Sequence, residues 1–414
     1  MSEVSCIEAN KVKSSLFKVI ILSMGLLALP IPTVADDSGF LGHPSTSERE
    51  ASIHGHNDDI DSPGLTGNWG GVRDLLKKNG VSFEATYTGE IASNFDPGLI
   101  SNQKDSIYLD NIDLTLTIDT EKADLWPGGT FFIYGLANSG RNPSEGVIGD
   151  LQTASNIEAP NTFLLYELWY EQEFSDFTSV LFGFHDLNSE FYISEYSSLF
   201  LNSSPGVGAE MSGNVPVSIF AKTGLAVRLH FSPTDNWYIQ TAAYDGDPAT
   251  RSLKSSEGKM YIIESGISTE MGTYKAGYWM HTANITFNGN NFSGDYGYFG
   301  IVDQKLFDIG EHGDIGAFVR WGAVPSNRNE IISNLQFGLH MHGLIPTRDE
   351  DDFGIAYIRA NTHIGNETVY EFTYRAVLSP WLVIQPSFQF IQNPGGDPAN
   401  ATIKVGLLRF EIAL

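Results

Sequence analysis

The sequence is poor in cysteine, in basic residues and in long apolar runs. Its 414 residues include one cysteine and 24 lysines and arginines against 50 aspartates and glutamates, a formal charge of −26 at pH 7. Nucleic acid needs a basic surface, so this charge argues against it as a partner. The near-neutral mean hydropathy argues against a bundle of membrane-spanning helices.

Enzyme signatures are missing as well. The chain contains no Gly-x-Ser-x-Gly elbow, no His-Glu-x-x-His zinc motif and no glycine-rich phosphate loop. His340 and His342 would place two imidazoles on one strand face, but two ligands make an incomplete metal site. We therefore expect no catalytic residues, no metal and no cofactor.

The N-terminus has the features of a secretory signal. A basic start is followed by an apolar stretch at Val19–Leu29 and by small residues that end at Ala35. The apolar stretch is too short for a comfortable membrane span, which argues against a retained anchor. We predict a signal peptide at 1–35, which contains Cys6, and a polar periplasmic arm at 36–64. Removal of the signal leaves 21 basic and 48 acidic residues, a charge of −27.

The stretch 162–173 shows the dominant pattern of the chain. Successive side chains of a strand point to opposite faces. One face would be apolar and aromatic, with Leu164, Tyr166, Leu168 and Tyr170. The other would carry Leu165, Glu167, Trp169, Glu171 and Glu173, an acidic row with one indole. Similar alternation recurs along the chain, and many of these segments place charges and carboxamides on one side. This pattern is typical of a transmembrane barrel with a lipid face and a polar lumen.

The strand pattern predicts an all-β fold, a transmembrane antiparallel β-barrel of about 16 strands. The expected strands lie near 82–92, 107–119, 129–137, 163–173, 178–184, 222–232, 236–244, 260–270, 273–283, 295–303, 313–323, 332–343, 353–362, 367–378, 381–391 and 402–414. A short periplasmic helix is expected at about 69–79, ending before Gly80, so the porin domain would span 65–414 and its barrel 82–414. Most links after even-numbered strands are short, and the long links follow odd-numbered ones. The long links would be outer loops, with both ends of the barrel in the periplasm.

Several short motifs resemble the OprB family of carbohydrate-selective porins. They are Leu65–Arg73, Tyr87–Glu90, Asn111–Leu114, Tyr166–Gln172, Leu199–Asn202, Tyr244–Pro248, Glu371–Arg375 and Gln392–Gly396. Individually these motifs are weak, but their order over about 350 residues is specific. The resemblance implies a sixteen-stranded barrel in the bacterial outer membrane that transports sugars. The chain ends on Leu414, whereas the family usually ends on an aromatic residue.

The lumen should contain the residues that meet the solute. A pyranose has an apolar face that packs on aromatic rings and hydroxyls that need charged or amide partners. Strand alternation and the family resemblance give these candidates for substrate binding: Arg73, Glu90, Asp113, Glu167, Trp169, Glu171, Arg228, Arg320, Glu371 and Arg375. Trp169 stands out because it interrupts an acidic row, although an interfacial girdle position would also suit it. Arg73 either bonds acidic residues at the periplasmic mouth or caps the helix, and Arg375 can pair with Glu371.

The long link 185–221 is expected to be the third outer loop. Its aromatic residues would be costly to expose, so we predict that it folds into the barrel. Asp186, Asn188, Glu190 and Asn202 would then narrow the pore as a constriction loop. The alternative is a loop folded over the outer rim.

These features predict an outer-membrane porin for the facilitated diffusion of mono- or small oligosaccharides. A less selective, cation-biased porin and an outer-membrane enzyme with a site at the barrel rim are the alternatives. The expected partners are carbohydrate solutes, outer-membrane lipid and lipopolysaccharide, and the barrel-assembly machinery. Monomer and homotrimer both stay open.

Overall fold

The computed structural model describes residues 64–310 and 313–414. The predicted signal peptide at 1–35 lies outside the described residues, as does the predicted arm up to residue 63. Among the described residues, no helix is long and apolar enough to cross a membrane.

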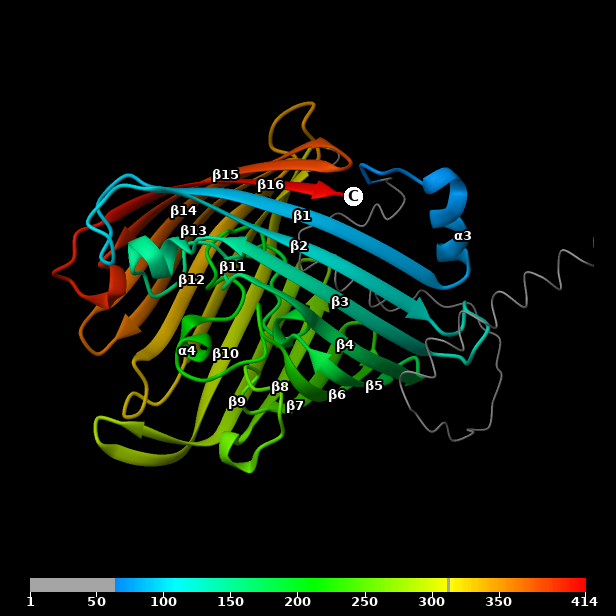
Figure 1. Ribbon diagram of the computed structural model, residues 1–414, viewed down its shortest axis with the longest axis horizontal. Coiled ribbons are helices and arrows are strands. Elements are labelled where there is room, and N and C mark those ends of the chain that lie inside the picture. Colours follow the sequence, from blue (N-terminus) through cyan, green and yellow to red (C-terminus); the bar gives the residue numbers. More distant parts are fainter. Residues whose placement is uncertain (1–63, 311–312) are drawn as a thin grey trace, which may run out of the picture. The chain divides into compact units, whose positions relative to one another are not determined.

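Sixteen antiparallel strands form a closed barrel in which each strand pairs with its neighbours in sequence and β1 pairs with β16 (Figure 1). The strands are β1 Val81–Asn94, β2 Ser106–Asp119, β3 Gly129–Gly140, β4 Thr162–Ser175, β5 Thr178–His185, β6 Gly224–Thr234, β7 Trp237–Asp245, β8 Lys259–Thr269, β9 Gly272–Phe287, β10 Asn290–Ile309, β11 Gly313–Ala323, β12 Ile331–His342, β13 Asp352–Thr362, β14 Asn366–Ser379, β15 Leu382–Gln392 and β16 Ile403–Ala413. This architecture confirms the predicted fold class.

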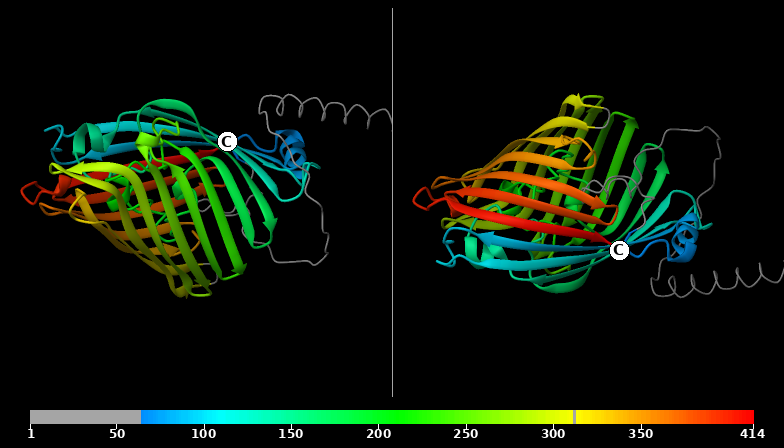
Figure 2. Two further views of the ribbon diagram at one scale, coloured as in Figure 1. Left: turned by 90° about the horizontal axis from the view of Figure 1, so that it is seen from below. Right: turned by 90° about the horizontal axis from the view of Figure 1, so that it is seen from above.

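The seam between the first and last strands closes the barrel. Residues Thr86 to Asn94 of β1 pair with Ala413 to Val405 of β16. The views from above and below show β16 lying along β1 (Figure 2). On β16 the side chain of Arg409 is buried inside and Leu408 is 44% exposed on the outside. The alternation of apolar and polar residues at the end of the sequence therefore corresponds to a lipid face and a lumen face.

A short helical segment precedes the barrel. It consists of η1 Trp69–Gly71 and α3 Val72–Lys78, and it lies beside the C-terminus in Figure 1. The Nη2 of Arg73 donates to the carbonyl oxygen of Leu414 at 2.8 Å, and its guanidinium lies over the Trp69 ring. Arg73 therefore ties the helix to the end of the last strand. Its partner there is a main-chain carbonyl and not an acidic lumen residue, which one of the two sequence interpretations had expected.

Strand β4 contains a bulge that changes which side chains face the lumen. The register with β3 shifts between Tyr134 and Gly135, so Tyr166 has no opposite residue. As a result Tyr166 is 2% exposed and points inward, whereas Phe163 is 79% exposed on the outer face. The alternation predicted for 164–173 holds only from Glu167 onward, and the assignment of Tyr166 to the lipid face is wrong.

Strands β9 and β10 are longer than the sequence pattern predicts, since they run to Phe287 and from Asn290. They join in a tight turn at Asn288 and Gly289, both with positive φ (48° and 76°). The residues added next to this turn are largely polar and lack the outward apolar row, which explains why they resemble a loop in the sequence.

Candidate functional site

Two long loops fold into the barrel instead of covering its rim. They are loop 141–161, with the short helical turn η2 Ser144–Ile148, and loop 186–223, with η3 Leu187–Ser189 and α4 Ala209–Ser212. In loop 186–223 the ring of Tyr192 stacks on Phe299 of β10 at 3.7 Å between centroids. Phe200 packs against Phe318 of β11 at 5.5 Å. These contacts cover inward-facing residues of the barrel wall, so the loops occupy part of the lumen.

Two glutamates of β14 hold the two loops through backbone amides. Glu371 accepts hydrogen bonds from the amides of Leu201 (2.8 Å) and Asn202 (3.1 Å) in loop 186–223. Glu367 does the same for Leu151 and Gln152 of loop 141–161, at 2.8 and 3.0 Å. Each carboxyl group therefore satisfies two main-chain donors of a loop.

Further acids of the wall repeat this arrangement along loop 186–223. They accept hydrogen bonds from backbone amides in the first part of the loop. Glu167 accepts from the Asp186 amide at 2.6 Å. Glu264 accepts from the Tyr192 amide at 3.0 Å, and Asp303 accepts from the Glu195 amide at 3.1 Å. Strands β4, β8 and β10 supply these acids. Wall carboxylates thus anchor the loop around a large part of the lumen.

Buried arginines complement the acids by donating to loop oxygens. Arg320 of β11 donates to the hydroxyl of Ser197 at 2.7 Å and to the carbonyl of Tyr192 at 3.0 Å. Arg409 bridges Glu90 of the wall (2.8 Å) and the Asn156 side chain of loop 141–161 (2.6 Å). The arginines of the wall therefore donate to oxygen atoms of the loops, and the acidic side chains of the wall accept from amides of the loops.

Arg228 is the centre of the most buried ion cluster. Its guanidinium bonds Glu171 of β4 at 2.9 Å and Glu190 of loop 186–223 at 2.5 Å, and its side chain is 0% exposed. An unpaired charge at this depth would be very unfavourable, so the two carboxylates compensate a buried cation. The sequence predicted all three residues as lumen groups, and the structure brings them together.

The remaining predicted lumen residues are buried or half-buried, and each contacts a neighbouring side chain or the loop backbone. Trp169 is 4% exposed and stacks on Phe132 at 4.9 Å, with the His185 ring 6.2 Å away. Asp113 accepts from the Tyr134 hydroxyl at 2.6 Å. The other three predicted loop residues bond within or near their loop: Asp186 accepts from Tyr166, Asn188 donates to the Phe191 carbonyl, and Asn202 accepts from the Ser204 amide.

Sequence reasoning missed three anchoring residues: Glu264, Asp303 and Glu367. Strand alternation could have identified them, since all three lie on the inward row of their strands, as it does for Arg409 in the polar row of the last strand. What alternation could not give is their role, because a backbone amide of a loop leaves no mark in the sequence.

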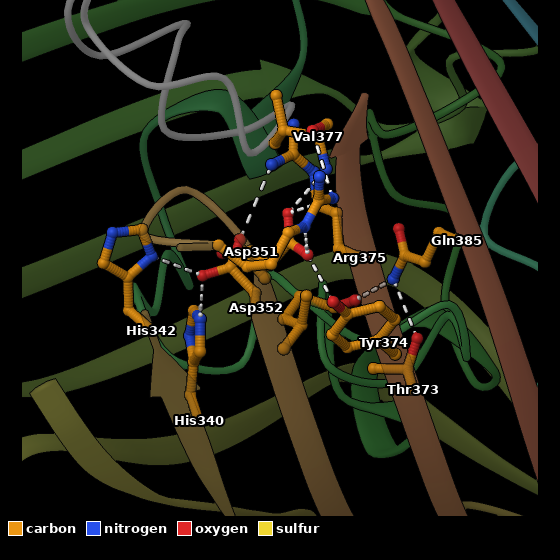
Figure 3. A network of polar contacts seen from close by, with 12 residues as sticks. His340, His342, Asp351, Asp352, Thr373, Tyr374, Arg375, Val377 and Gln385 are labelled. Carbon is orange, nitrogen blue, oxygen red and sulfur yellow. Dashed lines mark hydrogen bonds and ion pairs between the residues drawn. The ribbon is translucent and has the colours of Figure 1, made fainter. Parts of the chain in front are cut away.

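A different network lies where β12, β13 and β14 approach the short turns (Figure 3). His340 Nε2 and His342 Nδ1 lie 2.9 and 2.8 Å from the same oxygen of Asp352. Arg375 Nη1 is 3.5 Å from the other oxygen of Asp352. Arg375 therefore pairs across strands with Asp352, and the expected pairing with Glu371 on its own strand is not formed. In the described part of the chain, no three His, Cys, Asp or Glu side chains are grouped to hold a metal ion.

Two carboxyl groups near loop 141–161 have unusual acidity. Burial, and secondly the nearby Glu367 carboxylate, raise the pKa of Asp150 from 3.8 to about 7. Burial also raises the pKa of Glu158 from 4.5 to about 7, against hydrogen bonds from the amides of Glu145 and Ser144. The packing of loop 141–161 should therefore depend on the protonation of these two carboxyl groups.

Comparison with known proteins agrees with this architecture. The profile of the carbohydrate-selective porin, OprB family matches residues 103–414. The chain is 26% identical to Porin B of Pseudomonas aeruginosa, an alignment that covers 83% of this chain and 90% of that protein. It is 22% identical to the putative porin QuiX of Acinetobacter baylyi, over 80% of this chain and 89% of that protein.

A solved structure has the same fold. The high-pH structure of Pseudomonas putida OprB superposes with a TM-score of 0.78 at 22% identity, covering 85% of this chain and 99% of that one. The family profile spans most of the barrel, including the strands that anchor both loops. The chain therefore belongs to the OprB family of carbohydrate-selective porins of the outer membrane, which are channels and not enzymes.

Proposed function

We propose that the protein passes mono- and small oligosaccharides by facilitated diffusion through a lumen narrowed by loops 141–161 and 186–223. The observation that carries this proposal is the fastening of both loops to buried charges of the wall, through Glu367, Glu371 and Arg320. A passage held by many fixed hydrogen bonds keeps one width, and its paired charges favour neutral polar solutes over ions.

The lumen residues predicted from the sequence act in this proposal mainly by shaping the passage. Glu171, Arg228 and Glu190 compensate one another, and Glu371 holds a loop. Trp169 lies beside His185, the last residue before loop 186–223, so its indole supports the start of that loop. We expect Trp169→Ala to loosen the start of loop 186–223 and thereby to weaken glucose binding, by at most the roughly 1–3 kcal/mol that burial of a large apolar side chain contributes. Unchanged glucose binding in this variant would remove Trp169 from the proposal.

Liposome swelling tests the proposed selectivity. Proteoliposomes that contain the purified protein should swell faster in glucose than in zwitterionic amino acids of equal size. Equal rates for both solute classes would contradict sugar selectivity and favour a general porin.

The acidic composition supports the second candidate, a cation-biased porin for small solutes. Reversal potentials in a potassium chloride gradient decide between the two. A strong cation preference together with equal swelling rates would establish the cation-biased porin.

We also propose that residues 1–35 are a cleaved signal peptide and that 36–64 form a periplasmic arm. The basic start, the apolar stretch and the small residues before Asp36 support this. N-terminal sequencing of the protein from outer membranes should begin at Asp36, and a start at Met1 would contradict it.

A further inference from the structure

The network around Asp352 differs in its connections from the loop anchors. Its contacts run between wall strands, from His340 and His342 on β12 through Asp352 on β13 to Arg375 on β14 (Figure 3). The anchors instead join the wall to a loop, as Glu371 does with Leu201. The ion pairs and hydrogen bonds within the Asp352 network therefore connect strands of the wall and do not reach the loop backbone.

Water reaches this network more readily than it reaches the anchors. The side chains of His342, His340 and Asp352 are 27%, 16% and 12% exposed. The side chains of Arg228 and Glu171 are 0% and 3% exposed. A solute inside the barrel can therefore touch the imidazoles and the carboxylate, whereas the Arg228 cluster is closed to it.

The ion pair of Asp352 with Arg375 is longer than the contacts of Asp352 with the two imidazoles. Both imidazoles approach one oxygen of Asp352, and the second oxygen is 3.5 Å from Arg375 Nη1. That separation exceeds the usual length of an N–H···O hydrogen bond. A sugar hydroxyl placed beside the pair can donate to the carboxylate and accept from the guanidinium, which satisfies both ions at once.

The tip of loop 186–223 borders the network. The Tyr196 ring packs edge-on against the His340 ring at 5.7 Å, and the Tyr196 hydroxyl donates to Asp314 of β11 at 3.2 Å. Gln385 of β15 donates to the carbonyl of Leu199, which lies in the same tip of the loop. The network thus lies directly next to the narrowed part of the lumen, at the end with the short turns.

We propose that His340, His342, Asp352 and Arg375 form a hydroxyl-binding subsite for pyranoses on the periplasmic side of loop 186–223. This inference rests on the proposed function, because it gives a sugar that has passed the loop a place to bind. The mixture of one carboxylate, one guanidinium and two imidazoles supplies both acceptors and donors, and vicinal hydroxyls need both.

Glucose-induced current noise in planar bilayers tests the subsite with the full-length protein. Asp352→Asn should raise the dissociation constant for glucose about tenfold, as expected for lost charge-assisted hydrogen bonds. His342→Gln, at the most exposed member, should raise it about threefold. Asp308→Asn is the matched control, since it removes a 72% exposed carboxylate that pairs with Lys305 of β10. It should leave the constant unchanged.

Heat-modifiable mobility on a gel shows whether each variant has folded. If Asp352→Asn does not fold, His342→Gln decides the question. An unchanged dissociation constant in the folded variants would overturn the subsite, while glucose-selective swelling of the parent would leave the proposed function standing. If the parent itself swells equally in glucose and amino acids, both the subsite and the proposed function fail.

Discussion

The barrel wall and the two inward loops are held by different interactions. The wall consists of strands in which main-chain groups pair with both neighbours around the complete ring. Loops 141–161 and 186–223 instead depend on side chains of the wall, such as Glu367 and Glu371, for their contacts with it. The wall is therefore insensitive to most changes of inward side chains, whereas the loops depend on a few of them.

This difference separates the membrane-inserted scaffold from the part that sets selectivity. Strand pairing is required in the bilayer because unpaired main-chain groups find no water there. The loops lie in the lumen and not in hydrocarbon, so the loss of one anchor costs about 1–3 kcal/mol in loop packing and leaves the pairing of the strands intact. Changes to the wall should therefore abolish assembly, and changes to the anchors should alter permeation in an assembled barrel.

Removal of the end of the last strand should have the largest effect. Truncation of Phe410–Leu414 deletes the part of β16 that pairs with Thr86–Gly89 of β1 and the carbonyl that Arg73 binds. Open edges in hydrocarbon cost several kcal/mol per unpaired group, so we expect no assembly. The heat-sensitive compact band on a gel should be missing.

Leu414→Phe is the matched control for this truncation. It keeps the main chain and should be tolerated or assemble better, because barrels of this kind commonly end on an aromatic residue. A truncated chain that still gave the compact band would contradict the closure argument.

Deletion of Ser194–Gly213 should widen the channel while the wall stays intact. The deleted part contains Phe200, which packs on Phe318, and the two amides that Glu371 binds. We expect single-channel conductance to rise several-fold and selectivity among sugars to fall, with the compact gel band retained. Conductance equal to that of the parent would show that the segment does not limit the pore.

The sequence predicted the wall better than the loops for a physical reason. Alternation along a strand has a fixed period, so the inward positions of Asp113, Arg228 and Arg320 could be read directly. Tyr166 was misplaced because a bulge interrupts that period. The partners of Glu371 could not be predicted at all, because they are backbone amides about 170 residues away in the chain.

The anchor Glu371 allows a finer test of the same comparison. Glu371→Ala removes both acceptors for the amides of Leu201 and Asn202, and leaves Ser387 without its partner. We expect the loop to loosen and the single-channel current to fluctuate more, at a cost of about 1–3 kcal/mol in loop packing. Glu371→Gln keeps one acceptor and should lie between the parent and the alanine variant. Steady currents in both variants would mean that other contacts hold the loop.

The smallest expected effect is a pH dependence of loop 141–161. The pKa of Asp150 and that of Glu158 are both raised to about 7 when the loop is packed. A raised acid pKa means that the packed loop binds protons more strongly than the released loop does. Packing is thus most stable below about pH 4, weakens as the pH rises toward 7, and changes little above that.

A single fluorescent label can report this loosening. The one cysteine of the chain lies in the predicted signal peptide, and a Cβ added at Gly146 would meet no atom within 4 Å. Gly146→Cys, labelled with a dye that does not titrate, should show lower anisotropy at pH 8 than at pH 5. In the added background of Asp150→Asn and Glu158→Gln the difference should become clearly smaller, since neither amide titrates. Equal or higher anisotropy at pH 8 in the parent background would mean that these two carboxyl groups do not control the loop.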